Sequence, residues 1–336
     1  MATIYEVSKL AGVSLATVSR VMNDSGRVSD STREKVLKAM SELDYAPNAF
    51  AQSLASNRSN CVGVLVSEMH GPIFGAMLSG IEAELSQSGK TAIFAVGHSD
   101  AEKEKEGIKF LASRNCDALI LHVEALPSTY FQERKGRMLP FVLLNRSGRD
   151  IEENCVSLDN EMGGYLATQS LLDFGHRRIG YISGPLGWSD ARDRLAGHRR
   201  ALHEAGIDFD ERALVEADYT EAASGRATER LISSGLGLTA IVCANDEMAA
   251  AAMEVIRRRG LTIPGDLSVV GFDNVYWSRY LYPRLTTIDY PIDEMSRAAA
   301  HWVLREVYHR GPDSIPQKHK PRLMQRESSG PVRGSA

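Results

Sequence analysis

The segment from residue 14 to residue 20 combines three kinds of side chain that together suit contact with DNA. Short hydroxyl groups bond readily to phosphate oxygens, and a guanidinium can bond through two N–H groups to the O6 and N7 atoms of guanine. Small apolar groups can contact the methyl group of thymine. The segment supplies all three kinds, in Ser14, Leu15, Ala16, Thr17, Ser19 and Arg20. We expect it to read base edges in a major groove.

A second set of polar and aromatic residues is spread over the rest of the chain, mostly near the ends of short apolar runs. It comprises Phe74, His122, Asn145, Asp190, Arg194, Tyr219, Asn245 and Asp273. In sheets of parallel strands, ligands bind outside the carboxyl ends of the strands. Carboxylate, amide and guanidinium groups gathered there can bond to the hydroxyl groups of a small ligand, and an aromatic ring can stack on its face. Such a site rejects an analogue lacking a hydroxyl, because its own buried polar groups would stay unpaired.

Several of these residues have purely structural alternatives. Asp190 could do no more than cap the helix that follows it, and Arg194 could pair with a structural carboxylate. His122 could simply be packed, as a lone histidine near a strand end often is. Asn245 is the ligand candidate of its pair, because Asp246 can cap the helix that begins there. Since Arg194 is cationic, a positively charged ligand is disfavoured.

The elements that position the first set are short helices. Residues 4–11 follow helical spacing behind Thr3, which forms a capping box with Glu6. Gly12 predicts the end of this helix and Ser14 the start of the next. The small residue and glycine at the turn let the two helices cross closely, as in a helix-turn-helix. On these residues alone, a small helical bundle that contacts protein remains an alternative. A third helix is expected to begin after Ser29 or Ser31.

From Cys61 onward the pattern changes to alternating strands and helices. Helical patterns of 10–15 residues lie between most of the apolar, β-rich runs, which are CVGVLVS, TAIFAVG, ALILHV, PFVLLN, CVSLD, RIGYIS, AIVCAN and SVVGFD. This rhythm is typical of parallel sheets in an α/β fold. About 270 residues of it normally divide into two lobes.

Net charge is a weak guide to the partner of this chain. The 336 residues include 39 Lys+Arg and 43 Asp+Glu, so the net charge of −4 taken alone argues against nucleic acid. Residues 1–60, however, carry seven basic and six acidic residues, which leaves the head at +1 and the remainder at −5. The sign of this difference fits a nucleic-acid-binding head on an acidic body.

Other chemistry is disfavoured by what the sequence lacks. The four cysteines are far apart without a CxxC pair, so free and mostly buried thiols are expected rather than disulfides or a zinc site. The start, MATIYEVSKL, has no signal-peptide pattern, and no stretch of 18 apolar residues occurs, so we expect a cytoplasmic protein without a membrane span. GxGxxG, GxxxxGK[ST], HExxH and GxSxG are absent. We therefore expect no enzyme, no metal and no cofactor. The basic stretches His176-Arg177 and His198-Arg199-Arg200 are expected at the surface.

The N-terminal sequence resembles a known family. TIYEVSKLAGVSLATVSRVMN, followed by REKVLKAMSELDYAPNAFAQSLAS, is similar to the DNA-binding head and hinge of the LacI/GalR family of bacterial transcriptional repressors. The resemblance covers about residues 2–330, and GPIFGAM and SRYLYPRLTT look most like galactose repressors. It implies that Leu15 and Ala16 discriminate between operators, that Arg20 contacts a base, and that Tyr45 and Asn48 contact the DNA backbone near the hinge.

The same resemblance implies a hinge helix over residues 48–56 that enters the minor groove. Leu54 matches the leucine that wedges into the central base step, and Ala51 is small enough for close approach. An apolar wedge of this kind unstacks the step and kinks the duplex. A plain linker is the alternative for this stretch.

The body resembles periplasmic sugar-binding proteins, which serve the family as its effector domain. The resemblance implies that the strand-end residues bind a sugar, with a hexose or hexose phosphate preferred, and Arg194, Asn245 and Asp273 match the family's effector positions most clearly. The implied domains are a helix-turn-helix head (1–46), a hinge helix and linker (47–60), a two-lobed sugar-binding and dimerisation domain (61–330) and a tail (331–336). The implied protein is a homodimer on a palindromic operator, controlled by galactose or another hexose. Alternatives are a corepressor-dependent regulator and a sensor of a disaccharide, sugar phosphate or nucleoside. A transport-class sugar-binding protein is opposed by the head, and a sugar-modifying enzyme by the lack of a catalytic acid–base pair.

Overall fold

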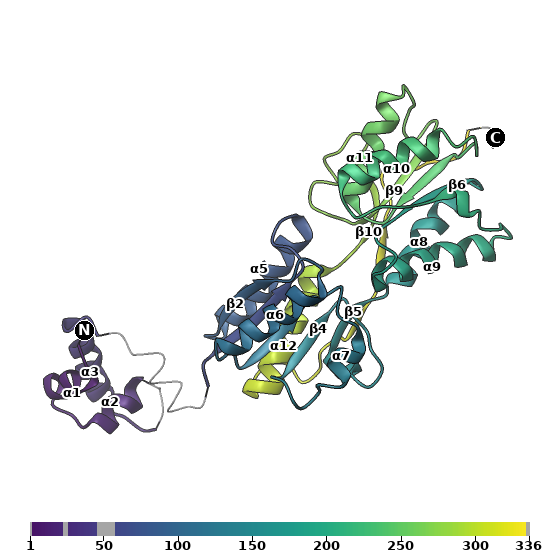
Figure 1. Cartoon of the computed structure of the whole chain (residues 1–336). Coiled ribbons are helices and arrows are strands. Elements are labelled where there is room, and N and C mark those ends of the chain that lie inside the picture. Colours follow the sequence, from purple (N-terminus) through teal and green to yellow (C-terminus); the bar gives the residue numbers. More distant parts are fainter. Residues whose placement is uncertain (1, 23–25, 46–57, 334–336) are drawn as a thin grey trace. The chain divides into compact units, whose positions relative to one another are not determined.

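The computed structural model describes residues 2–22, 26–45 and 58–333, and the chain forms two compact units, Met1–Asn60 and Cys61–Ala336 (Figure 1). The described residues contain no helix that is long and apolar enough to cross a membrane.

The described part of the first unit contains three helices, α1 (Ile4–Ala11), α2 (Leu15–Met22) and α3 (Asp30–Glu42). Thr3 caps α1, and its backbone N–H donates in return to the Glu6 carboxylate at 2.7 Å, which confirms the capping box. Gly12 ends α1 with φ +66°, a conformation that glycine adopts at little cost. α3 begins after Ser29, the first of the two predicted starts.

A small core holds these three helices together. Its fully buried members come from all three helices and are Val7, Val18, Val21, Val36 and Ala39. Ser8 Oγ donates to the carbonyl of Val13 at 2.6 Å, which fixes the turn between α1 and α2. The head is therefore stabilised by apolar packing on one side of each helix, and the opposite sides face solvent.

The first lobe of the second unit is a parallel sheet in the order β11-β5-β4-β3-β1-β2. Its strands are β1 (Cys61–Val66), β2 (Thr91–Val96), β3 (Ala118–Leu121), β4 (Phe141–Leu144), β5 (Cys155–Leu158) and β11 (Lys318–His319). Its helices are α5 (Pro72–Gln87), α6 (Ala101–Ser113), α7 (Ser128–Gln132) and α12 (Ile292–Tyr308). α5 and α12 pack on one face of the sheet, whereas α6 and α7 pack on the other.

The second lobe repeats this plan in the order β12-β10-β9-β8-β6-β7, in which only β12 is antiparallel to its neighbour. Its strands are β6 (Ile179–Ser183), β7 (Leu214–Glu216), β8 (Ala240–Cys243), β9 (Ser268–Asp273), β10 (Thr286–Asp289) and β12 (Arg322–Met324). Its helices are α8 (Asn160–Asp173), α9 (Ser189–Glu204), α10 (Glu221–Ile232) and α11 (Asp246–Arg258). The eight predicted strands are all present, and the two-lobed α/β prediction is confirmed.

Within residues 58–333 the chain crosses between the lobes three times, after β5, after β10 and after β11. The second crossing returns α12 to the first lobe, where it packs against α5 (Figure 1). In each lobe, strand order reverses beside the first strand of that lobe, β1 or β6, and such switch points are where doubly wound sheets bind ligands.

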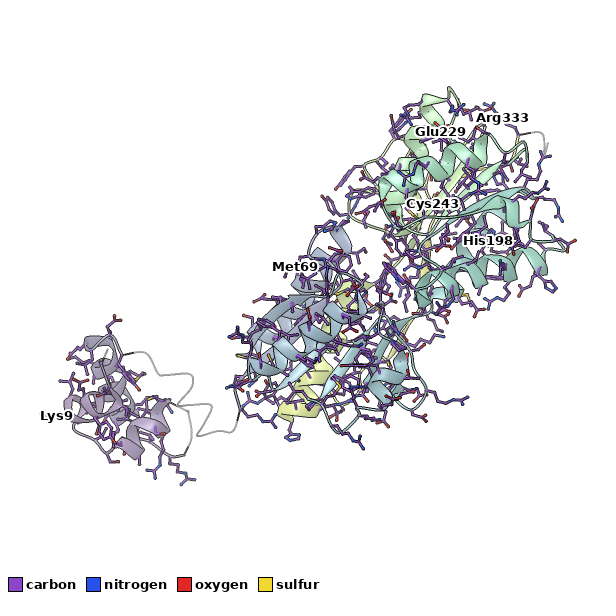
Figure 2. The ribbon with its side chains drawn as sticks, in the orientation of Figure 1. Lys9, Met69, His198, Glu229, Cys243 and Arg333 are labelled. Atoms are coloured by element: carbon purple, nitrogen blue, oxygen red, sulfur yellow. The ribbon has the colours of Figure 1, made fainter. Side chains whose placement is uncertain are left out.

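The expectation that the two basic stretches lie at the surface is wrong for their histidines. His176 is 2% exposed and bonds to Thr239 and to the carbonyl of Gly330. His198 is fully buried in the second lobe (Figure 2), where Nδ1 lies 2.8 Å from Thr168 Oγ1. Adjacent arginines suggested a surface patch, but His198 lies on α9, and a helix points neighbouring residues in different directions.

The prediction of free thiols is confirmed. None of the four cysteines, which all lie in the described part of the chain, forms a disulfide; three of them are buried, and Cys61 is half-buried. Figure 2 shows Cys243 inside the second lobe.

Candidate functional site

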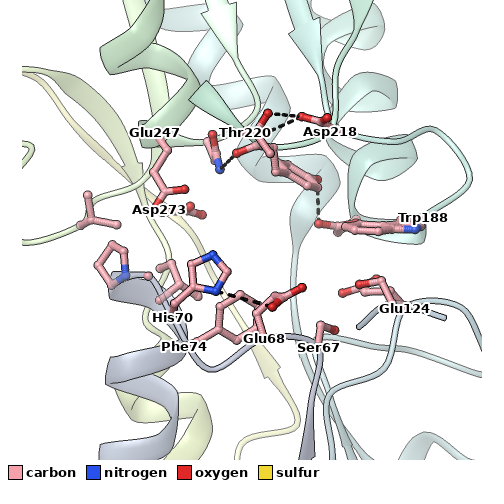
Figure 3. A pocket seen from close by; sticks show the side chains of 18 of the residues that line it. Ser67, Glu68, His70, Phe74, Glu124, Trp188, Asp218, Thr220, Glu247 and Asp273 are labelled. Atoms are coloured by element: carbon pink, nitrogen blue, oxygen red, sulfur yellow. Dashed lines mark hydrogen bonds and ion pairs between the residues drawn. The ribbon is translucent and has the colours of Figure 1, made fainter. Parts of the chain in front are cut away.

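A cavity of about 580 Å³ lies between the two lobes of the second unit, at the carboxyl ends of both parallel sheets (Figure 3). The eight residues predicted to contact a ligand all line it, namely Phe74, His122, Asn145, Asp190, Arg194, Tyr219, Asn245 and Asp273. They come from different strands and helices that are up to 200 residues apart in the sequence, and the fold brings them together around one space.

Arg194 of α9 is the only buried cation among the described residues that line the cavity. Its Nε donates to Asn160 Oδ1 at 2.9 Å and its Nη1 to the carbonyl of Ala244 at 2.6 Å. The guanidinium lies 3.7 Å from the centre of the Phe272 ring, so it also stacks on the core. The side chain is 3% exposed, and its geometry is therefore fixed before any ligand enters.

Two carboxylates that line the cavity balance the charge of Arg194. Nη2 lies 3.9 Å from Asp190 Oδ2, and Nη1 lies 3.8 Å from Asp273 Oδ1. Burial acts to lower the pKa of Arg194, but Tyr219, Asp190 and Asp273 outweigh it and raise that pKa. Arg194 thus pairs with carboxylates, and both of these partners belong to the cavity wall.

Arg194 is held in place by close contact between α8 and α9. A Cβ atom on Gly164 would lie 1.9 Å from the carbonyl oxygen of Arg194, and one on Gly197 would lie 1.9 Å from that of Glu161. Since no side chain fits these two positions, the helices touch backbone to backbone. This contact sets the depth at which α9 presents residue 194 to the cavity.

Asp190 faces the cavity and does not cap its helix. Trp188 is the N-cap residue of α9 and makes no side-chain cap bond. Asp190 Oδ2 instead accepts from Tyr219 Oη at 2.8 Å, whereas Oδ1 is buried without a hydrogen-bond partner in the described structure. The hydroxyl of Tyr290, another lining residue, is equally buried and, among described residues, equally unpartnered. Such groups are costly unless something supplies the missing bonds.

Aromatic rings form two sides of the same space. The rings of Trp188 and Tyr219 lie 5.7 Å apart at 30° on the second lobe. On the first lobe, the rings of Phe74 and His122 lie 5.6 Å apart and perpendicular to each other. A flat, partly apolar ring that entered the cavity would meet aromatic faces as well as polar groups.

His122 is neutral in this environment. Burial lowers its pKa to about 4, and Ser67 Oγ lies 3.2 Å from its Nδ1. The loop after it is fixed from below, because the buried Glu104 carboxylate accepts three backbone N–H groups, those of Glu124, Ala125 and Leu126.

The backbone is strained at three of the lining residues. Asn145, Tyr219 and Asp273 have φ values of +55°, +67° and +110°, which L-residues seldom adopt. Strain of this kind persists where the surroundings impose it, and it clusters at binding sites. Asn145 Oδ1 accepts from Asn160 Nδ2 at 3.1 Å, so Asn160 connects Asn145 of the first lobe to Arg194 of the second.

The prediction that Asp246, and not Asn245, caps the following helix is wrong. Asn245 is the N-cap of α11 and accepts from Met248 N at 2.8 Å, and its Nδ2 donates to the carbonyl of Tyr219 at 3.3 Å. Asp246 is buried beneath the cavity, where it accepts from Thr287 Oγ1 at 2.5 Å and from Val275 N at 2.9 Å. One residue therefore both caps the helix and lines the cavity.

The head presents its predicted DNA-reading residues on one helix. Ser14, Ala16 and Arg20 are exposed, and Leu15, Thr17 and Ser19 are half-buried. Ser14 Oγ bonds to Thr17 Oγ1 and accepts from Thr17 N, so the predicted cap of α2 is present. Tyr45 packs its ring on the head core. Three predicted residues, Asn48, Ala51 and Leu54, lie outside the described part of the chain.

Comparison with known proteins decides the family. Residues 3–48 match the model for bacterial regulatory proteins of the lacI family, and residues 168–329 match that of a periplasmic binding protein-like domain. The chain is 39% identical to the HTH-type transcriptional regulator GalR of Escherichia coli (strain K12), over 98% of this chain and 96% of that protein. The chain belongs to the lacI family. It is therefore a DNA-binding transcriptional regulator of a family that is not enzymatic.

Two solved structures extend the likeness over both units of this lacI-family chain. The lac repressor dimer bound to operator and the anti-inducer ONPF has a TM-score of 0.86 against it, with 29% identity over 98% of this chain and 99% of that one. The transcriptional regulator CelR in complex with cellobiose has a TM-score of 0.71, with 31% identity over 98% of this chain and 100% of that one.

Several lining residues of this lacI-family cavity escaped the sequence prediction. They are Ser67, Glu68, His70, Glu124, Asp218, Thr220, Glu221, Glu247 and Tyr290. Ser67 and Glu68 directly follow the first apolar run, so the strand-end rule that selected Asn145 could have found them. Tyr290 follows β10, a strand too short and polar to be recognised. Glu124 lies three residues beyond β3 but directly follows the apolar run ALILHV, so the same rule could have found it.

Proposed function

We propose that the chain is a homodimeric repressor whose affinity for a palindromic operator is controlled by a small sugar, in the first place galactose or another hexose. The observation that supports a sugar ligand is the cavity, where buried polar atoms on fixed side chains have no hydrogen-bond partner among the described residues. Asp190 Oδ1 and Tyr290 Oη are the clearest cases. Closely spaced hydroxyl groups of a sugar can meet such atoms on several sides at once.

In this proposal each lining residue has a definite task. Arg194 and Asn245 donate to ring or hydroxyl oxygens, and Asp273 accepts from hydroxyl groups. Asp190 accepts one hydroxyl on its unpartnered oxygen, and Asn145 and His122 bind from the first lobe. The faces of Phe74 and Trp188 stack on the apolar face of the ring. Because the ligand touches both lobes, it favours the arrangement in which the two are closed on it.

A disaccharide is the second candidate effector. Two observations favour it: the cavity, at about 580 Å³, is in the size range of sites for drug-sized ligands, and a similar structure is a complex with cellobiose.

Most of the proposed operator contacts are made by α2 and its N-cap. Ser14, Thr17 and Ser19 bind phosphates or sugar edges, Leu15 and Ala16 discriminate between bases, and Arg20 binds guanine. Tyr45 and Asn48 contact the backbone, and Leu54 with Ala51 enters the minor groove. Because one such head reads half a site, a two-fold dimer on a palindrome is the natural assembly.

Three exposed tyrosines support the homodimer. Tyr276, Tyr280 and Tyr282, between β9 and β10, are 65%, 74% and 85% exposed. Aromatic residues are enriched at protein interfaces, and a lac repressor dimer is among the similar structures. Analytical ultracentrifugation of the wild-type chain should give a dimer, and Tyr282→Asp should shift it toward monomer. A monomeric wild type at micromolar concentration would contradict this part of the proposal.

The effector is proposed to act as an inducer. Coupling between two sites is reciprocal, so a sugar that weakens operator binding by some factor is itself bound more weakly, by the same factor, when operator is present. A corepressor would show the opposite sign in the same measurement.

The experiment has two stages. A thermal-shift panel of common mono- and disaccharides identifies a ligand, because a ligand that binds only the folded state raises its stability, by about 2.7 kcal/mol at 100 times its Kd. Fluorescence anisotropy with a selected operator then measures DNA affinity with and without that ligand. We expect a hexose to stabilise the chain and to weaken operator binding. Unchanged operator affinity with every sugar that binds would refute the proposed control.

A further inference from the structure

Glu124 is a buried carboxyl group in the cavity wall for which the described structure shows no bonded cation (Figure 3). Its side chain is 6% exposed, and the one polar side-chain contact found for it is His122 Nε2, at 3.5 Å from Oε1. That distance is longer than an ordinary hydrogen bond. The His122 ring does not balance a negative charge either, because burial lowers its pKa to about 4 and leaves it neutral.

The segment that carries Glu124 is held from two sides, so the carboxyl group is kept at the cavity. The fully buried Glu104 of α6 accepts from the backbone N–H groups of residues 124–126 at 2.8–3.0 Å. Arg146, which follows Asn145 in the chain, donates to the carbonyl groups of residues 123, 124 and 126 at 2.8–3.2 Å. Both backbone polar groups of residue 124 are therefore bonded to side chains of other elements.

The cations near Glu124 are engaged elsewhere. The hydrogen bonds found for the Arg146 guanidinium all go to backbone carbonyl groups. Arg194 of α9 is flanked by two acids of its own lobe, Asp190 and Asp273. A carboxyl group that is buried without a paired cation avoids the cost of a buried charge by keeping its proton.

The electrostatics agree with this geometry. Burial is the main cause that raises the pKa of Glu124 well above its usual range, and Asp190 raises it further, whereas Arg146 opposes the rise. A protonated carboxyl group has one O–H donor, which a carboxylate lacks. Since His122 Nε2 is not within an ordinary hydrogen-bond distance, this donor remains available to a molecule in the cavity.

We propose that Glu124 takes part in ligand binding as a neutral carboxylic acid, whose O–H group donates a hydrogen bond to an oxygen atom of the ligand. Glu124 is then a specificity-determining residue of the first lobe. The inference rests on the proposed sugar-sensing function, to which it adds a named contact and a dependence of sugar affinity on pH.

The neutral acid and an ionised one would select different groups of a sugar. A carboxylate only accepts, so it would bind hydroxyl groups as donors. The protonated group also binds oxygen atoms that carry no hydrogen, which in a sugar are the ring oxygen and the glycosidic oxygen. Glu124 thereby complements Asp190, whose buried Oδ1 has no partner among the described residues and can accept from a sugar hydroxyl.

Sugar affinity should fall as pH rises. Because the ligand binds the protonated form, affinity is full below the pKa of Glu124 and falls as pH rises through that pKa, by up to about 10-fold per pH unit for one proton. Other titratable or charged groups act on Glu124 or are influenced by it, namely Glu104, His122, Arg146, Asp190, Arg194, Tyr219 and Tyr290. All of them are retained in Glu124→Gln, so the difference between wild type and this variant reports residue 124.

The test is isothermal titration calorimetry on the full-length chain between about pH 5 and 9, with galactose, glucose and cellobiose as probes. Glu124→Gln keeps the shape and an N–H donor but cannot titrate. At the acid end it should bind sugar within about 3-fold of the wild type, and as pH rises the wild type should weaken relative to it. Glu124→Met keeps the length without a donor and should bind about 5- to 10-fold more weakly at the acid end.

Glu106→Gln is the matched control, at an exposed position on α6, and it should follow the wild type at every pH. Titrations in two buffers of different ionisation enthalpy count the protons exchanged on binding. The wild type should take up a proton with the sugar where Glu124 is ionised, and this uptake should be absent in Glu124→Gln. If Glu124→Gln is unstable, the direction of proton exchange in the wild type decides: uptake supports the inference, and release or no exchange overturns it.

The remaining outcomes separate this inference from the function on which it rests. Binding by Glu124→Gln as weak as that of Glu124→Met, or wild-type affinity that rises with pH relative to Glu124→Gln, would make Glu124 an ionised acceptor and overturn the inference, with sugar sensing intact. Binding by Glu124→Met as tight as that of the wild type would remove Glu124 from the site. If none of the three sugars binds, the proposed function fails, and the inference fails with it.

Discussion

The head and the cavity of this lacI-family chain place their functional side chains in opposite environments. On α2 the candidate reading residues Ser14, Ala16 and Arg20 are exposed, and the core beneath them is purely apolar. In the cavity, Asp190 and Arg194 are more than nine-tenths buried. The head reads a large external ligand with its surface, whereas the cavity must bury polar groups in order to surround a small one.

This difference determines how much the functional residues of each region lower the stability of the folded state. Exposed hydroxyls and guanidinium groups are hydrated before they bind, so they add little strain to the folded head. Buried carboxylates, the positive φ at Asp273 and the unpartnered oxygen of Asp190 all destabilise the body until a ligand arrives. Substitutions at the cavity should therefore change stability and function together, and those on the reading face should change function alone.

Arg194→Ala should give the largest effect. It removes the cation between Asp190 and Asp273, and breaking a buried ion pair by removing one partner costs about 3–5 kcal/mol. Sugar binding should fall below detection while operator binding persists, which gives a repressor that ignores its effector. Urea unfolding followed by tryptophan fluorescence reports the body, because Trp188, Trp277 and Trp302 all belong to it.

Arg199→Ala is the matched control for Arg194→Ala. Arg199 lies on the same helix and pairs at the surface with Glu211, at 2.7 Å, and such a pair is worth about 0–1 kcal/mol. Its removal should leave sugar binding intact. Normal induction by sugar in Arg194→Ala would remove Arg194 from the proposed site.

The head was predictable because its signals are local. Thr3 with Glu6, Gly12 and Ser14 act within five residues of themselves, and each does what its position in the sequence indicates. The strands and strand-end residues of the body were predictable for a similar reason, since an apolar run and the polar residue after it are adjacent.

Other features of the cavity depend on contacts between distant parts of the chain. Asn160 matters because it touches both Asn145 and Arg194, and no local pattern announces that. Tyr290 reaches the cavity only because a short, polar segment becomes β10. Glu124 is buried by the loop that Glu104 fixes from another helix.

Asp246→Asn tests the cost of burial through pH. Burial raises the pKa of Asp246 to about 7, whereas an Asp in the unfolded chain titrates near 4. Between about pH 4 and 7 the folded state holds a proton that the unfolded state has lost, so the unfolding free energy falls as pH rises, by up to about 1.4 kcal/mol per unit. The asparagine cannot titrate. When the unfolding free energy is measured by urea unfolding between about pH 4 and 7, its dependence on pH should therefore be shallower in the variant.

The stability of the head should depend on pH in the opposite direction to that of the body. Bonds from the backbone and side chain of Thr3 lower the pKa of Glu6, so its stabilising effect is present above the usual glutamate range and fades as pH falls. Hydrogen exchange of amides in α1, measured on the full chain, follows this separately. If the pH dependence of the unfolding free energy of the body were the same in Asp246→Asn as in the wild type, Asp246 would be ionised over the whole pH range.

Gly164→Ala should have a smaller effect that reaches the cavity indirectly. Its Cβ would overlap the carbonyl of Arg194, and overpacking of this kind costs about 1–3 kcal/mol. Because α9 must move away from α8, sugar affinity should fall as well. Gly75→Ala is the contrasting variant, since a Cβ there has nothing within 4 Å, and it should stabilise α5 by about 0.5–1 kcal/mol. Equal stability of the two variants would contradict the close α8–α9 contact.

Arg20→Ala should leave stability almost unchanged, because the side chain is exposed and the core of the head does not include it. Its effect should appear in specificity, as a loss of about 1–3 kcal/mol of discrimination at one base pair of each half-site. Selection of binding sites from a randomised half-site library, for wild type and variant, measures this as one flattened position among unchanged ones. A uniform loss of affinity across all sequences would instead make Arg20 a phosphate contact. A loss of stability comparable to that of Arg194→Ala would break the contrast between exposed and buried functional residues, because a side chain that reads a surface should not also support the fold.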